Sequence, residues 1–78
     1  MSDVMDKVKE VIVDVMKVDA SEIHPETRFI EDLKADSMDQ FFLIDGFCEK
    51  FEINIADEDA KEIKTVADVV TFIENMNN

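Results

Sequence analysis

Ser37 is the first candidate for chemistry in this chain, because two carboxylates, Asp36 and Asp39, flank its hydroxyl. A serine becomes a nucleophile when a general base lies beside it and a third group orients that base. The single histidine, His24, belongs to a proline-containing stretch, where we expect it to face solvent or pack against a loop. A hydrolase with Ser37 as its nucleophile therefore lacks a nearby base, and the sequence disfavours that class.

Cys48 is the single cysteine, so the sequence offers neither an internal disulfide nor a cysteine-rich zinc site. It falls on the apolar side of a predicted helix, where we expect a small core or boundary residue. Asp57, Asp59 and Asp68 have the spacing of positions one, three and twelve of an EF-hand loop. Position five would then be a lysine, and position six a glutamate where glycine is required. No metal site is predicted, although weak divalent-ion binding among the carboxylates stays open.

The composition is that of one small acidic domain over residues 1–78. Its 20 acidic and 8 basic residues give a net charge of −12, and 46% of its residues are hydrophobic. This apolar content argues against disorder, and the charge argues against nucleic acid as a partner. The longest apolar run, residues 41–44, is far short of the roughly 20 residues that a membrane span needs. No stretch of signal-peptide type is seen, so we expect a cytoplasmic monomer.

Apolar periodicity predicts an all-α fold. Apolar residues spaced for one helix face mark two helices, Asp3–Lys17 and Ser37–Phe51, and a last helix that begins at Thr65. Thr65 and Asp68 fit a capping box at the start of this last helix. A short helix is predicted over Asp57–Ile63. One glycine and one proline could not supply the turns of an all-β fold. We therefore expect a small four-helix bundle with three main helices, one short helix and a long first loop.

The long first loop covers residues 18–36. A helix through His24-Pro25 is unfavourable, because the residue before proline is pushed out of the α region. A loop of this length is rarely idle in so small a domain. We expect it to pack onto the core through its apolar residues: Val18, Ile23, Phe29, Ile30 and Leu33.

The second helix is expected to begin with a capping box, in which Ser37 and Gln40 satisfy free backbone N–H groups. One apolar stripe of this helix is predicted to face the core; it comprises Phe41, Ile44, Phe47, Cys48 and Phe51, widened by Met38 and Phe42.

Negative charge concentrates on and around the second helix. Residues 31–62 hold 11 acidic and 3 basic residues, a net charge of −8. Such a surface can simply be a solvated face that keeps the protein soluble. It can also be a docking surface for basic patches on partner proteins, where charge speeds association and salt weakens it.

The segment Phe29–Asp39, with its Asp-Leu-Lys-Ala-Asp-Ser-Met-Asp run before an acidic helix, resembles the prosthetic-group attachment site of acyl carrier proteins. The chain length, the helix spacing and the Thr65-Val66 start of the last helix extend this resemblance over the whole chain. It implies that a phosphopantetheinyl transferase attaches 4′-phosphopantetheine from coenzyme A to Ser37. The thiol of this arm would then carry acyl groups as thioesters for the enzymes of fatty-acid synthesis or of a specialised acyl or polyketide pathway. The protein itself would catalyse nothing.

The resemblance also implies roles for other side chains. Asp36 and Asp39 would be recognition residues beside the attachment point, and Met38, Asp45 and Glu49 would contact partners. The partners would be the transferase and the acyl-transferring and condensing enzymes with basic docking patches. The bundle interior would hold the acyl chain, lined by Phe41, Phe47, Phe51, Ile55, Ile63 and Phe72.

Several residues depart from the family pattern. Lys34 replaces a common glycine, and Met38 a common leucine. Phe42 replaces a usual acidic residue and Asp45 a usual apolar one, which weakens the case for recognition by the common fatty-acid synthesis enzymes. The bulk of Phe41 and Phe47 predicts a smaller interior and a preference for short or unusual acyl groups.

A different class of protein fits the same residues. In that alternative the chain is a small acidic protein-binding domain, and Ser37 is only the N-cap of the second helix.

Overall fold

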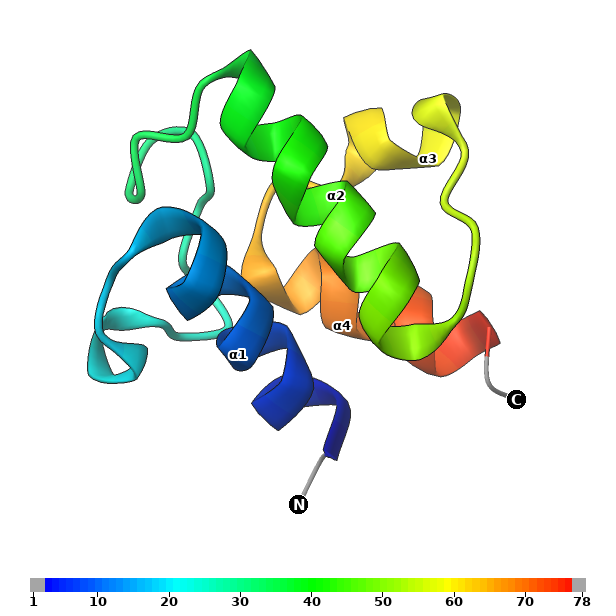
Figure 1. Cartoon of the computed structure of the whole chain (residues 1–78), viewed down its shortest axis with the longest axis horizontal. Coiled ribbons are helices and arrows are strands. Elements are labelled where there is room, and N and C mark those ends of the chain that lie inside the picture. The colour runs from blue at the N-terminus through cyan, green and yellow to red at the C-terminus, as the bar shows by residue number, and fades with distance from the viewer. Residues whose placement is uncertain (1–2, 77–78) are drawn as a thin grey trace.

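The computed structural model describes residues 3–76 and shows four α-helices (Figure 1). They are α1 (Asp3–Met16), α2 (Ser37–Phe51), α3 (Asp57–Glu62) and α4 (Val66–Met76), and a 3-10 turn, η1, covers Ala20–Glu22. The small all-α bundle expected from the sequence, with a long first loop, is confirmed. None of the helices in this described range is both long and apolar enough to cross a membrane.

The core lies where α1, α2 and α4 meet. The side chains that close it are almost fully buried: Val8, Ile12, Leu43, Phe47, Val66, Val69 and Ile73. They recur at helical spacing along each of the three helices, so each helix turns an apolar face toward the core. Removal of this apolar surface from water is the main force that holds the helices together.

Residues 17–36 run along one side of the bundle, from the end of α1 to the start of α2 (Figure 1). As expected, this segment packs onto the core, through Ile23 and Phe29, which are 1% and 4% exposed. Backbone hydrogen bonds fasten it to the start of α4: the N–H of Phe29 donates to the carbonyl of Lys64, and the N–H of Val66 donates to that of Thr27. The expectation for Ile30 is wrong, because that side chain is 58% exposed.

The ends of the helices follow from local chemistry. The N–H of Asp68 donates to the Thr65 hydroxyl, and the N–H of Thr65 donates to the Asp68 carboxylate, which is the capping box expected before α4. Lys17 and Glu52 follow α1 and α2 in the left-handed conformation, with φ of 59° and 55°. This conformation is common just after a helix and stops its propagation.

α1 and α2 approach each other closely at Gly46. A Cβ atom at this position would lie 2.8 Å from Cγ1 of Val11, well inside van der Waals contact. Val11 is buried, and a β-branched side chain in a helix has essentially one favoured rotamer. The absence of a side chain at Gly46 therefore sets how near the two helices lie.

We expect Gly46→Ala to lower the free energy of unfolding by about 1 kcal/mol, measured by urea denaturation. Overpacking costs about 1–3 kcal/mol, and the better helix propensity of alanine offsets about 1 kcal/mol of that cost. Val11→Ala removes the clashing methyl group. The double variant should therefore be more stable than the sum of the two single effects predicts. Strict additivity would contradict the close contact.

Candidate functional site

The first turn of α2 is capped by Asp36, not by Ser37. The N–H of Asp39 donates to Oδ1 of Asp36 at 2.9 Å, and the N–H of Asp36 donates to Oδ2 of Asp39 at 3.2 Å. The two aspartates thus cap the helix reciprocally. The expected capping box of Ser37 and Gln40 is wrong by one residue. Asp-x-x-Asp meets the same requirement, and carboxylates are favoured at the positive end of the helix dipole.

This cap leaves the Ser37 side chain without a structural task. Ser37 is the first residue of α2 and is exposed. Among the residues that the structure describes, none forms a hydrogen bond with its hydroxyl. A group attached to Oγ would extend into solvent beside first-turn N–H groups, where an anion is favoured.

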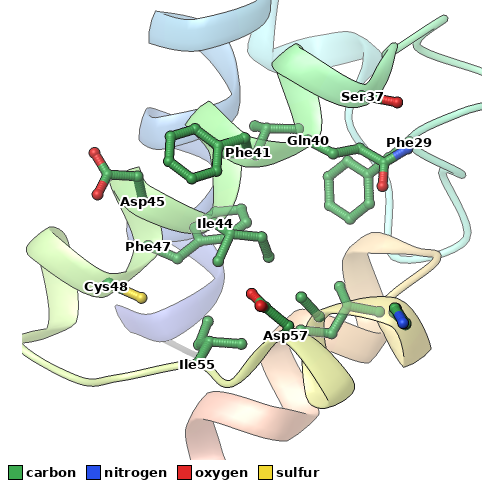
Figure 2. A pocket seen from close by; sticks show the side chains of 14 residues that line it. Phe29, Ser37, Gln40, Phe41, Ile44, Asp45, Phe47, Cys48, Ile55 and Asp57 are labelled. Carbon is green, nitrogen blue, oxygen red and sulfur yellow. The ribbon is translucent and has the colours of Figure 1, made fainter.

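Ser37 borders a cavity of about 350 Å³ between α2, α3 and the loop residue Phe29. Figure 2 shows Ser37 at one end of the cavity and Cys48 with Ile55 toward the other. Cys48 stands eleven positions after Ser37 in α2, about 16.5 Å farther along the helix axis. The cavity has an apolar lining that comprises Phe29, Phe41, Leu43, Ile44, Phe47, Cys48, Ile55, Ala60 and Ile63.

Three of the six residues expected in the acyl pocket line this cavity: Phe47, Ile55 and Ile63. Phe41 also touches the cavity, but its side chain is 69% exposed, so it lies at the rim and not in the interior as expected.

The other two expected pocket residues lie elsewhere. Phe51 is half-buried, with Nζ of Lys7 above its ring at 5.9 Å from the centroid. Phe72 borders a separate surface hollow next to Asp59 and Thr71.

Sequence reasoning missed two important lining residues. Phe29 comes from the long loop, and its ring lies 6.4 Å from that of Phe47, centroid to centroid. Ala60 comes from α3, a helix of six residues that carries no recognisable apolar face. The packing of Phe29 on the core was expected, but no periodic signal says that a loop or so short a helix borders a cavity.

The expected partner-contacting residues share one side of α2. Met38, Asp45 and Glu49 are all exposed and stand at i, i+7 and i+11. Phe41 and Phe42 lie between them, 69% and 49% exposed, although the sequence predicted both in the core stripe. These five residues form what we call the outward face of α2. Its role in binding partners stays a prediction.

The remaining reactive side chains do not join Ser37 in a catalytic arrangement. His24 borders a different surface hollow, with Glu22 and Glu26. Cys48 is half-buried at the cavity wall, as expected of a boundary residue. Within residues 3–76 no group of three or more His, Cys, Asp or Glu side chains is placed to hold a metal ion.

Arg28 organises the turn that carries Phe29 to the cavity. Its guanidinium binds Glu31 at 2.6 Å and both oxygens of Asp32 at 3.2 Å, and its backbone N–H donates to Asp32 at 2.8 Å. Hydrogen bonds from the side chain and then from the backbone of Arg28 lower the pKa of Asp32. The charged form of this carboxylate is thus favoured by folding.

We expect Arg28→Gln to raise the pKa of Asp32 toward its ordinary value, because the charged hydrogen bonds are lost while that from the backbone persists. A carboxyl-carbon NMR titration measures this change. Since folding depresses the pKa of Asp32, the contribution of this carboxylate to the free energy of unfolding is present above its pKa in the unfolded chain, about 3.9. It is lost as pH falls through the folded pKa.

Glu10 provides the matched control, because a hydrogen bond from Lys50 lowers its pKa in the same way. Arg28→Gln should leave the pKa of Glu10 unchanged. Lys50→Gln should raise the pKa of Glu10 without affecting that of Asp32. An unaltered Asp32 titration in Arg28→Gln would contradict the assignment.

Comparison with known proteins agrees with this geometry. Residues 6–73 match the family described as "Phosphopantetheine attachment site". Over 72 residues the chain is 54% identical to the acyl carrier protein of Helicobacter hepaticus, and the matched region covers 92% of this chain and 95% of that protein. Over 71 residues it is 49% identical to the acyl carrier protein of Solidesulfovibrio magneticus, covering 91% of each. This chain therefore belongs to the acyl carrier protein family and bears acyl groups on a covalent 4′-phosphopantetheine arm.

Proposed function

We propose that Ser37 is the residue to which the phosphopantetheine arm is attached. The supporting observation is its position: an exposed hydroxyl, not engaged by the helix cap, at the mouth of an apolar cavity. In the reaction, Oγ of Ser37 forms a bond to the phosphorus next to pantetheine in coenzyme A. The pyrophosphate bond breaks, and adenosine 3′,5′-bisphosphate leaves. A separate transferase supplies the catalysis, and the hydroxyl proton leaves to its general base.

The cavity is the proposed resting place of the acyl chain. Its lining is mostly apolar, with Phe47 fully buried and Ile55 and Ile63 half-buried. An acyl chain placed there is removed from water, which is favourable by roughly 0.8 kcal/mol for each buried methylene group. Polar side chains such as Gln40 and Lys61 lie among the lining residues. They suit the amide-rich phosphopantetheine arm better than they suit the acyl chain.

In this role the protein presents cargo and leaves the chemistry to its partners. Those partners are the transferase and acyl-transferring and condensing enzymes, which approach an acidic surface. Asp36 and Asp39 have a capping task that the sequence analysis did not foresee. Their contact with the transferase is a second proposed task. The single cysteine, which cannot form an internal disulfide, and the use of coenzyme A as donor favour a cytoplasmic location.

We expect the intact mass of the protein to rise by one phosphopantetheinyl group after incubation with coenzyme A and a broad-specificity transferase. Ser37→Ala should show no increase, because it lacks the only oxygen proposed to accept the group. Ser21→Ala is the matched control, since Ser21 is also an exposed serine on a turn of helix. Modification of Ser37→Ala, or an unmodified wild-type chain, would contradict the proposal.

The same variant tests the alternative of an acidic binding domain in which Ser37 is only a cap. Loss of a capping side chain costs about 1 kcal/mol. Because Asp36 caps α2, Ser37→Ala should leave the free energy of unfolding within about 0.5 kcal/mol of the wild-type value. A loss near that of a true cap would favour the alternative.

We expect short acyl groups to stabilise the loaded protein most. Phe41 lies at the rim, so the restriction in cavity size rests on Phe47, which is fully buried. The melting temperature of the loaded protein should rise with chain length at first and stop rising early in a series of acyl groups from butyryl to palmitoyl. Phe47→Leu should extend those gains to longer chains, because it removes ring volume at the cavity wall.

Phe51→Leu is the matched control for this series. Phe51 is a half-buried phenylalanine of the same helix that does not line the cavity. Its replacement should lower the melting temperature of every loaded form equally and leave the chain-length profile unchanged. Steady gains up to palmitoyl in the wild-type protein would contradict the size limit.

A further inference from the structure

The aromatic wall of the cavity is built partly from a loop. The rings of Phe29 and Phe47 both line the cavity, with their centroids 6.4 Å apart. Phe47 is held by α2 and is fully buried in the core. Phe29 belongs to the segment before α2 (Figure 2), so a different set of contacts has to hold its ring in place.

The backbone on both sides of Phe29 is hydrogen bonded. The N–H of Phe29 donates to the carbonyl of Lys64 at 3.0 Å, and the N–H of Ala35 donates to the carbonyl of Phe29 at 2.9 Å. The N–H of Asp32 donates to the carbonyl of Arg28, also at 2.9 Å. The backbone that carries Phe29 is therefore a closed turn.

One carboxylate fastens this turn from the outside. Oδ2 of Asp32 accepts hydrogen bonds from the backbone N–H of Arg28 at 2.8 Å and from its Nε at 3.2 Å, and Oδ1 accepts from Nη2 at 3.2 Å. Nη1 of the same guanidinium donates to Glu31 at 2.6 Å. We call these contacts the Arg28 clasp. Because the guanidinium fork and the carboxylate are both planar, the clasp fixes direction as well as distance.

The clasp lies at the surface, where most ion pairs contribute little. The side chains of Arg28, Glu31 and Asp32 are 52%, 65% and 40% exposed. A bidentate pair of arginine and carboxylate that belongs to a network is the arrangement that keeps its strength there. Since its partners all lie within four residues of Arg28, loss of the clasp should loosen the turn and leave the core of the three long helices packed.

A longer acyl chain needs room, and in a close-packed interior that room comes from the displacement of a wall. Phe47 cannot move without opening the core. α3 has no buried residue, and the room gained on that side is the same whether or not the clasp is intact. Phe29 can move only with its turn, so the clasp opposes any gain of room on the loop side.

We propose that Arg28 is a positioning residue that sets the longest acyl chain the cavity accepts, because its clasp holds the turn that places the Phe29 ring near that of Phe47. This inference deepens the proposed function and rests on it, since the cavity must be the place where the acyl chain is held. The size limit is thereby assigned to two rings, one fixed by the core and the other by a surface clasp. The clasp requires the fork of arginine, and a positive charge alone does not replace it.

The test loads the phosphopantetheine-bearing protein with acyl groups from butyryl to palmitoyl and records the melting temperature of each form. In Arg28→Gln the melting temperature should keep rising for about two methylene groups beyond the wild-type limit, because the Phe29 wall can then yield. Asp32→Asn removes the other half of the clasp and should give the same extension. The double variant should extend the limit no further than either single variant. Arg28→Lys should resemble Arg28→Gln, because an ammonium group cannot form the fork.

Lys50→Gln is the matched control, because it removes an ion pair with Glu10 that is also exposed and does not line the cavity. It should lower the melting temperature of every loaded form equally and leave the chain-length limit unchanged. A second readout needs no cargo. In Arg28→Gln, hydrogen exchange at the N–H groups of Phe29 and Ala35 should be about tenfold faster, while exchange at the N–H of Phe47 stays unchanged.

An unchanged chain-length limit in Arg28→Gln would overturn the inference, and so would an equal shift of the limit in Lys50→Gln. A wild-type limit in Arg28→Lys would overturn the role of the fork. A limit that Phe47→Leu extends and Arg28→Gln does not would contradict this inference and leave the proposed function standing. Steady gains up to palmitoyl in the wild-type protein, or no loading at Ser37, would contradict the proposed function and this inference with it.

Discussion

Reciprocal capping by Asp36 and Asp39 fixes the residue at which α2 begins, and the rest of the site follows from that residue. Successive residues of an α-helix are about 100° apart around its axis. The packing of Leu43 and Phe47 into the core fixes the rotation of α2 about that axis. The cap and this packing together determine which side chains close the core, which line the cavity and which face solvent.

The cavity depends on two segments that have little regular structure of their own. Phe29 reaches it from the long loop, and that loop is held by backbone hydrogen bonds to Lys64 and Val66 and by the contacts of Arg28. Ala60 and Ile63 reach it from α3 and the residue after it. Phe29 is 4% exposed, whereas α3 has no buried residue. Of the two walls, α3 is therefore the one better able to yield to the proposed cargo.

The sequence sufficed to predict elements whose signals are local or strongly periodic. The single apolar faces of α1 and α4 led to nearly correct bounds, and Thr65 with Asp68 identified the cap of the last helix. α2 was harder, because it is apolar on both sides. Periodicity could not decide whether Phe41 or Leu43 faces the core, and the answer came from tertiary packing.

In the candidate site, too, the residues with local signals could be predicted and those brought together by tertiary packing could not. Ser37, the proposed attachment residue, and its neighbours stand together in sequence, so a resemblance could point to them. The cavity is assembled from segments far apart along the chain, so Phe51 and Phe72 were wrongly placed in it and Phe29 was missed. Size and polarity alone did not distinguish a large side chain that lines a cavity from one that packs beside it.

Because the cap uses Asp36, the oxygen of Ser37 contributes nothing to the start of α2. An arm attached to this oxygen, as we propose, then neither breaks nor creates a bond that the helix needs. Acyl groups would be exchanged at the thiol of the arm, away from Oγ, so the scaffold would stay unchanged through many rounds of loading and delivery. The form that carries cargo and the empty form would then differ only in the cargo and in the surfaces that the cargo touches. A partner must therefore distinguish the two forms without a change of fold.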